Sequence, residues 1–202
     1  MKVLTIYDTN INERHIAEVV DALRDGYIVI YPTDTVYGLG VDALNKKAIE
    51  NLCRLKGLDP NKNLLSLVCS GLSQASEYVR IDNTAFSTLK NYLPGPFTFV
   101  LPASTRLPKI FKNRKTIGLR IPDNTIARRL AEELGNPLLS SSVDIPDADP
   151  ESAAEPENLA VTYANDVAVV IDGGRSILEH STIVDLSDPD DPIVLREGIG
   201  EL

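Results

Sequence analysis

Residues 28–40 read IVIYPTDTVYGLG, an apolar run that meets a proline and then a stretch of hydroxyl groups, one carboxylate and two glycines. The β-prone run 27–31 predicts a strand that is buried on both faces. Pro32 cannot donate a hydrogen bond to a neighbouring strand, so the strand is expected to end there. Gly38 and Gly40 predict a sharp bend in the polar loop that follows. Because open α/β sheets bind ligands at strand ends, this loop is a candidate binding segment, with simple turn capping by its polar groups as the alternative.

Helical and extended segments alternate along the rest of the chain. Apolar residues on one helical face predict helices at 12–24 and 46–56, and further helices are expected near 82–92 and 124–134. Short β-prone runs predict strands at 64–69, 97–101, 116–121, 137–142, 167–172 and 181–186. This alternation predicts an α/β fold built on one twisted, mixed sheet, and the length of 202 residues fits a single domain spanning 1–202.

Charge is distributed unevenly along the chain. The net charge is −9, yet residues 46–129 hold 15 Lys or Arg against 5 Asp or Glu, whereas residues 132–202 hold 2 against 17. The middle of the chain therefore has the composition to hold an anion. The acidic, proline-rich segment 144–158 predicts a mobile loop or a short surface helix rather than a second domain.

Several function classes are not supported by the sequence. No apolar window is long enough for a membrane span and the N-terminus lacks a signal-peptide pattern, which predicts a cytoplasmic protein with no membrane partner. Cys53 and Cys69 have no CxxC spacing, so neither a disulfide framework nor a metal site is predicted. The phosphate-binding patterns GxxxxGK[ST] and GxGxxG are absent, as are GxSxG and HExxH.

Polar side chains recur where other predicted strands end. In TIGLRIP (116–122), Thr116 and Arg120 are four residues apart on an extended run and point to the same face. An inward-facing arginine requires an anion. PLLSSSVD (137–144) and STIVDL (181–186) add hydroxyl groups, which together with Arg or Lys suit a phosphate or a carboxylate. The alternative for each segment is turn capping or a surface arginine.

The segments YPTDTVYGLG, KGLDPNKN, PGPFTFVLP, TIGLRIP, LLSSS and STIVDL occur in this order between about residues 21 and 200. Together they resemble the YrdC-type L-threonylcarbamoyladenylate synthase superfamily, and RLKGLDPNKN with SSSVD is more similar to its YciO-like branch than to the established synthases. The resemblance implies a YrdC/RibB-like twisted open mixed sheet, flanked by helices and enclosing a central, positively charged cavity. It also implies a nucleotidyltransferase that condenses threonine, bicarbonate and ATP to threonylcarbamoyl-AMP and pyrophosphate for tRNA modification. Mg²⁺ would offset the charge of the triphosphate.

The resemblance further assigns roles to individual residues. Lys56 and Arg120 would be catalytic, and Arg120 would pair with the threonine carboxylate. The other residues on the threonine side would be Thr35, Tyr37, Ser140 and Ser181. The residues on the ATP side would be Lys62, Thr116, Ser142 and Arg196. If Arg120 is an unpaired buried cation, its removal should leave stability unchanged or raise it.

Two departures from the synthase pattern weaken the expected ATP site. Leu58 stands where the synthases have the arginine of K-x-R, and Asp144 stands where they have the asparagine of S-A-N. Lys62 would restore part of the lost positive charge. If Leu58 and Asp144 affect the same phosphate, the effects of Leu58→Arg and Asp144→Asn on ATP affinity should be coupled. The alternative function is a non-catalytic protein of the same fold that binds double-stranded RNA or a nucleotide. Its candidate RNA-binding region is 109–129, which begins with the basic cluster of Lys109, Lys112, Arg114 and Lys115. His15 and His180 are expected to face solvent or to cap turns.

Overall fold

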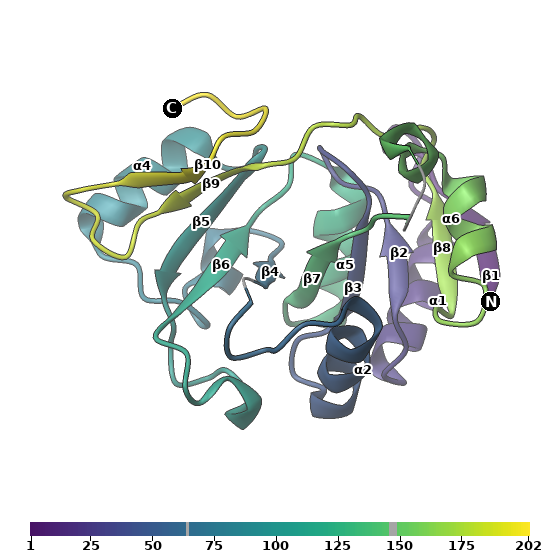
Figure 1. Cartoon of the computed structure of the whole chain (residues 1–202), viewed down its shortest axis with the longest axis horizontal. Helices are drawn as coiled ribbons and strands as arrows, with labels where there is room; N and C mark the ends of the chain where they lie inside the picture. Colours follow the sequence, from purple (N-terminus) through teal and green to yellow (C-terminus); the bar gives the residue numbers. More distant parts are fainter. Residues whose placement is uncertain (64, 146–148) are drawn as a thin grey trace.

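The structure is a computed structural model that describes residues 1–63, 65–145 and 149–202. The described strands form one sheet of ten strands in the order β1-β8-β2-β3-β7-β4-β6-β5-β9-β10 (Figure 1). The strands are β1 (Lys2–Thr5), β2 (Val29–Tyr31), β3 (Gly38–Asp42), β4 (Ser66–Val68), β5 (Phe97–Pro102), β6 (Thr116–Arg120), β7 (Leu138–Ser142), β8 (Val169–Asp172), β9 (Thr182–Asp185) and β10 (Ile193–Arg196).

The sheet is mixed, as the sequence predicts. β8 runs parallel to both β1 and β2, whereas β3 is antiparallel to both β2 and β7. β4 is antiparallel to β7 and parallel to β6, and β5 is antiparallel to β6 and parallel to β9. β10 closes the series as an antiparallel edge strand on β9. The predicted α/β fold with one mixed sheet is therefore confirmed.

Helices cover the sheet on both faces. They are α1 (Glu13–Arg24), α2 (Lys46–Lys56), α3 (Leu72–Ala75), α4 (Asn83–Tyr92), α5 (Thr125–Leu134) and α6 (Pro156–Thr162), with short 3-10 helices η1 (Lys109–Phe111) and η2 (Pro150–Ala154). α1 and α5 lie behind the sheet in Figure 1, and their apolar side chains share one core cluster. α2, α4 and α6 contribute to a second cluster that contains most of the remaining buried strand residues.

Asparagine and aspartate side chains fix where the helices begin. Asn12, Asn45, Asp82 and Asn124 each accept a hydrogen bond from a backbone N–H in the first turn of α1, α2, α4 and α5, respectively. These bonds satisfy donors that the helix itself leaves unpaired. The four predicted helices are therefore confirmed to within one residue at each end.

The polar segment after Pro32 differs from its expected structure. Gly38 and Gly40 lie in β3, paired with Tyr31 and Val29 of β2, rather than in a sharp bend. A Cβ atom on Gly40 would lie 2.7 Å from Cε1 of Tyr31. The glycines are therefore required for space, because the ring of Tyr31 lies against this part of β3.

The acidic segment 144–158 is partly helical. η2 and the beginning of α6 lie in it, which agrees with the predicted short surface helix. Residues 146–148 lie outside the described residues. No helix in the described part of the chain is long and apolar enough to cross a membrane.

Candidate active site

One cavity of about 510 Å³ lies among the central and C-terminal strands. Its walls come from β4, β5, β6, β7, β9 and β10, and from the connections that follow β7 and precede β9. The charged side chains of its described lining are Lys56, Arg120 and Arg196 against Asp144 and Asp149. The volume is in the range of small-molecule sites, and the lining combines fixed cations with hydroxyl groups.

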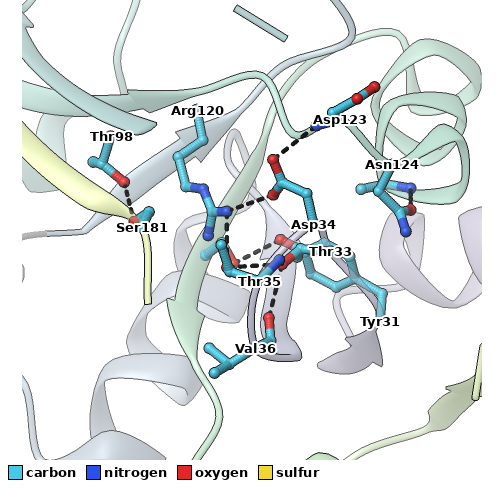
Figure 2. Close-up of polar contacts among 12 residues, drawn as sticks. Tyr31, Thr33, Asp34, Thr35, Val36, Thr98, Arg120, Asp123, Asn124 and Ser181 are labelled. Atoms are coloured by element: carbon cyan, nitrogen blue, oxygen red, sulfur yellow. Dashed lines mark hydrogen bonds and ion pairs between the residues drawn. The ribbon is translucent and has the colours of Figure 1, made fainter. Parts of the chain in front are cut away.

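Arg120 is held in the cavity by a buried carboxylate. Its Nη2 donates to Oδ1 of Asp34 at 2.8 Å, and the two side chains are only 10% and 8% exposed (Figure 2). Oδ2 of Asp34 accepts from the backbone N–H of Asp123 at 2.9 Å. The anion that the inward arginine requires is therefore supplied by the chain itself, from the loop between β2 and β3.

Thr35 completes the support of Arg120. Its buried Oγ1 accepts from Nη2 of Arg120 at 3.0 Å and lies 3.1 Å from Oγ1 of Thr33. Thr33 in turn donates to the carbonyl oxygen of Val36 at 2.8 Å. The PTDT segment thus holds the guanidinium group through Asp34 and Thr35 (Figure 2). Thr35, which is expected to face threonine, thus contacts the arginine that is expected to pair with the threonine carboxylate.

Part of the Arg120 guanidinium remains without a partner. Its Nε is buried and has no hydrogen-bond partner among the described residues. Burial and the positive charge of Arg120 lower the pKa of Arg196, which also lines the cavity. Arginine stays charged at physiological pH, so two guanidinium groups repel each other across this site. An anionic ligand placed between them would relieve that repulsion.

Ser181 lies between Arg196 and β5. Nη2 of Arg196 donates to the Ser181 carbonyl oxygen at 2.7 Å, and the Ser181 hydroxyl lies 2.9 Å from Oγ1 of Thr98 (Figure 2). These contacts join β5 and β10 to the residue that precedes β9 at the cavity wall. The sequence-predicted residues Ser140, Ser142, Ser181 and Arg196 are therefore brought together in one cavity with Lys56 and Arg120.

Lys56 ends α2 and reaches the cavity, where it forms an ion pair with Asp144. The Lys56 side chain is only 14% exposed. The carbonyl oxygen of Asp144 accepts from the hydroxyl of Tyr163 at 2.5 Å, which holds the backbone of this segment against α6. The carboxylate that departs from the synthase pattern thus neutralises the lysine that is expected to be catalytic.

Two residues expected on the ATP side are not among the described residues that line the cavity. Lys62 is 83% exposed and lies 3.7 Å from Asp59, so its charge is directed to solvent near its own turn. Thr116 lies at the other end of β6 from Arg120 and is half-buried. Leu58 packs against the larger core cluster. Lys62 therefore lies outside the described cavity lining, and its compensation for the charge missing at Leu58 stays a prediction.

Tyr37 has a supporting position behind the cavity. Its buried hydroxyl donates to the carbonyl oxygen of Gly174 at 2.7 Å and accepts from the N–H of Gly173 at 3.1 Å. Burial raises the pKa of Tyr37 to about 12, so the phenol stays protonated. It ties β3 to the start of the long connection from β8 to β9, which crosses the top of the view in Figure 1.

His180 is exposed, as expected, and it also lies on the cavity wall. Desolvation lowers the pKa of His180, and the positive charges of Arg196 and Arg120 lower it further, while Asp144 opposes them. Thr98 and Asp149 are also cavity residues that the sequence analysis did not single out. Thr98 lies within an apolar run and Asp149 within the acidic segment 144–158, so no local signal marked either of them as a cavity residue.

The His180 shift predicts a loss of stability in acid. The pKa of the folded state lies below the unfolded value of 6.5, so the unfolded chain binds more protons between these two values. The free energy of unfolding should therefore fall as the pH drops below 6.5, until the folded state is also protonated. Urea titrations of the wild type and of His180→Gln measure this contribution. They should cover about pH 7.5 to about pH 5.5, a range that brackets the ordinary pKa of histidine. His15→Gln removes a histidine outside the cavity and is the control; equal pH dependence of all three proteins would contradict the assignment.

Comparison with known proteins identifies the family. The Sua5/YciO/YrdC family model, which is described as telomere recombination, matches residues 21–198. The chain belongs to this family. The uncharacterized protein YciO of Escherichia coli strain K12 is 38% identical over 199 residues, which cover 98% of this chain and 95% of YciO. The crystal structure of E. coli YciO superposes with a TM-score of 0.90 at 36% identity, covering 99% of this chain and 97% of that one.

Threonylcarbamoyl-AMP synthases are further members that resemble this chain. The enzyme of Bacillus subtilis is 30% identical over 191 residues, which cover 93% of this chain and 54% of the enzyme. Sua5 of P. abyssi, whose crystal structure is a complex with L-threonine, gives a TM-score of 0.87 at 30% identity and covers 98% of this chain. This chain spans only 58% of that structure. The YciO relatives are therefore matched over nearly their whole length, and these two synthases over little more than half.

Proposed function

We propose that this protein is a threonylcarbamoyl-AMP synthase-like enzyme that acts on threonine, bicarbonate and ATP for tRNA modification. The observation that carries the proposal is the Arg120 guanidinium, which Asp34 and Thr35 orient while its Nε stays without a partner in the described structure. Such a group is suited to bind the carboxylate of an amino acid. A related protein of the same fold, P. abyssi Sua5, is known as a complex with L-threonine.

The residues of the cavity fit the charges that this reaction develops. The threonine amine would add to bicarbonate with loss of water, and an oxygen of the resulting carbamate would attack the α-phosphorus of ATP and release pyrophosphate. Both steps place negative charge on oxygen atoms, which fixed cations and hydroxyl donors stabilise. Arg120 would hold the threonine carboxylate, while Arg196 and Ser142 would lie toward the phosphates. Lys56 would assist only after it separates from Asp144.

A magnesium ion would enter this site with the nucleotide. No group of three or more metal-binding side chains occurs among the described residues. Of the two carboxylates in the described cavity lining, Asp144 pairs with Lys56, and Asp149 accepts from the N–H of Ser152. The described residues therefore offer no dedicated metal cage, and Mg²⁺ would be held mainly by the triphosphate, where it neutralises phosphoryl charge.

The proposal is tested by the dependence of pyrophosphate release on each substrate. Purified protein with Mg²⁺ should release pyrophosphate from ATP only when both threonine and bicarbonate are present. Release from ATP alone, at the same rate, would indicate an ATP hydrolase or a contaminant and would reject the synthase.

Binding of double-stranded RNA is a second candidate function, and one observation favours it. Lys109, Lys112 and Lys115 are exposed and form no ion pair within the described residues. Arg114, by contrast, donates to the carbonyl oxygens of Pro60, Asn63 and Thr116 and is therefore occupied within the fold. The expected basic cluster is reduced to three free lysines around η1.

RNA binding through these lysines should depend steeply on salt. Each neutralised phosphate releases counterions and contributes about one unit of slope, so the logarithm of the association constant should fall with a slope of about 3 against the logarithm of the salt concentration. Fluorescence anisotropy with duplexes of two unrelated sequences should give the same affinity, because duplex RNA is recognised mainly by shape. Replacing the three lysines with alanine should flatten the slope. An affinity that is independent of salt would exclude this mode of binding.

A further inference from the structure

Tyr31 is a fully buried tyrosine whose hydroxyl group is directed at a cavity residue. The residue is 0% exposed, and its hydroxyl donates to Oγ of Ser140 at 2.6 Å. Tyr31 ends β2 and Ser140 lies in β7, so the contact crosses the intervening strand β3. The ring lies beside the PTDT segment that supports Arg120 (Figure 2).

Two glycines in β3 make this crossing possible. A Cβ atom on Gly38 would lie 3.0 Å from Cζ of Tyr31 and 3.1 Å from Oγ of Ser140. A Cβ atom on Gly40 would lie 2.7 Å from Cε1 of Tyr31. Glycine weakens a strand interior, so its use at both positions indicates that the approach of the ring is required. The YGLG segment thus serves the contact between Tyr31 and Ser140.

The hydrogen bonds of Ser140 leave one lone pair of its hydroxyl oxygen without a partner in the described structure. A serine hydroxyl has one proton to donate and two lone pairs. Ser140 donates its proton to the carbonyl oxygen of Leu39 at 3.2 Å, and one lone pair accepts from Tyr31. Burial raises the pKa of Tyr31 to about 12, so the phenol remains a donor throughout the neutral range. What remains at Ser140, which lines the cavity, is an acceptor.

We propose that Tyr31 is a positioning residue that fixes Ser140 as a hydrogen-bond acceptor, so that the cavity selects an amino acid presenting an N–H or O–H donor at this point. The inference rests on the proposed amino-acid site and adds the orientation in which the ligand lies there. Arg120 has donors only and suits the carboxylate end of the ligand. Ser140 then receives a donor from the other part of the ligand, either its ammonium group or its hydroxyl group.

Calorimetric binding of L-threonine and of two analogues tests this inference. L-2-Aminobutyrate lacks the hydroxyl group and 3-hydroxybutyrate lacks the ammonium group, so they distinguish the two sources of the donor. In the wild type, loss of the donor that meets Ser140 should weaken binding by about tenfold or more. In Tyr31→Phe, the Ser140 hydroxyl is free to rotate. The dissociation constant of that analogue divided by that of threonine should then fall to about two, as expected for a hydrogen bond that has lost its preset direction.

Several controls separate a positioning role from a structural one. Tyr78→Phe removes the hydroxyl of another buried tyrosine that is not part of the described cavity lining and should leave both ratios unchanged. In a Ser140→Ala background, Tyr31→Phe should no longer alter threonine affinity, because Tyr31 acts through Ser140. If Tyr31→Phe fails to fold, Ser140→Ala alone should abolish the preference for threonine over the analogue that lacks the donor to Ser140.

Two different results would overturn the inference. If Tyr31→Phe weakens threonine and both analogues equally, Tyr31 has only a structural role while the amino-acid site stands. If the wild type binds neither threonine nor the analogues, the proposed amino-acid site is itself wrong, and the inference fails with it.

Discussion

Replacing Arg120 with alanine is expected to abolish threonine binding and to lower the free energy of unfolding by about 3 to 5 kcal/mol, the usual effect of removing one partner from a buried ion pair. The substitution leaves the carboxylate of Asp34 buried without its cation. The sequence alone predicts unchanged or higher stability for this variant, because it suggests an unpaired arginine. Chemical denaturation and calorimetric titration with threonine measure the two effects separately.

A second substitution separates stability from binding. The double variant Asp34→Ala/Arg120→Ala removes both buried charges and should be more stable than Arg120→Ala, yet it should still not bind threonine. Arg175→Ala is a control that removes an exposed arginine paired with Glu151 and Glu155, and it should change stability little. Threonine binding by the double variant would show that Arg120 is not the carboxylate ligand. An unchanged stability of Arg120→Ala would show that the pair with Asp34 does not form in solution.

Replacing Asp144 with asparagine is expected to tighten ATP binding by about tenfold or more, the gain expected when a charged hydrogen bond to phosphate becomes available. The reason is the ion pair with Lys56, which must otherwise break before the lysine can meet a phosphate. Leu58→Arg should add less, because Leu58 packs against the core and does not belong to the described cavity lining. The structure therefore gives different roles to the two departures from the synthase pattern.

The double variant Leu58→Arg/Asp144→Asn distinguishes the two interpretations. If both residues affect one phosphate, as the sequence suggests, their effects on ATP affinity should be coupled. With Asp144 acting through Lys56, we expect nearly additive effects, most of which come from Asp144. Glu157→Gln removes one exposed negative charge from α6 and is the control for net charge. An equal gain in Glu157→Gln, or no gain in Asp144→Asn, would contradict the role of the ion pair.

The local patterns of the sequence predict most of the sheet and its helices. β2 is an apolar run, β6 and β7 contain β-prone apolar residues beside their polar ones, and the four longer helices have one apolar face each, so both kinds of element are visible in the sequence. β3 was missed because GLGVD contains two glycines, which are normally poor strand residues. Its strand structure depends on the fit of Tyr31 against those glycines, which is a tertiary contact. β1 and β10 were missed as well; they are exposed edge strands with a partner on one side only.

The sequence predicted which residues form the candidate site better than it predicted how those residues contact one another. Motif positions identified Lys56, Arg120 and the cavity serines, which the structure brings together. The two ion pairs that decide their chemistry join residues 86 and 88 positions apart in the chain. Pairs at such separations leave no periodic or spacing signal, so neither the support of Arg120 nor the neutralisation of Lys56 was visible before the fold was known.

Mass spectrometry of the product is the most direct measurement of the proposed function. The protein is incubated with ATP, Mg²⁺, threonine and ¹³C-labelled bicarbonate, and the adenylate fraction is analysed at once. We expect threonylcarbamoyl-AMP that carries the label in its carbamoyl carbon, formed in the wild type and absent with Asp34→Ala/Arg120→Ala. If titrations show that ATP and threonine both bind but no labelled adenylate is formed, the protein is not a threonylcarbamoyl-AMP synthase.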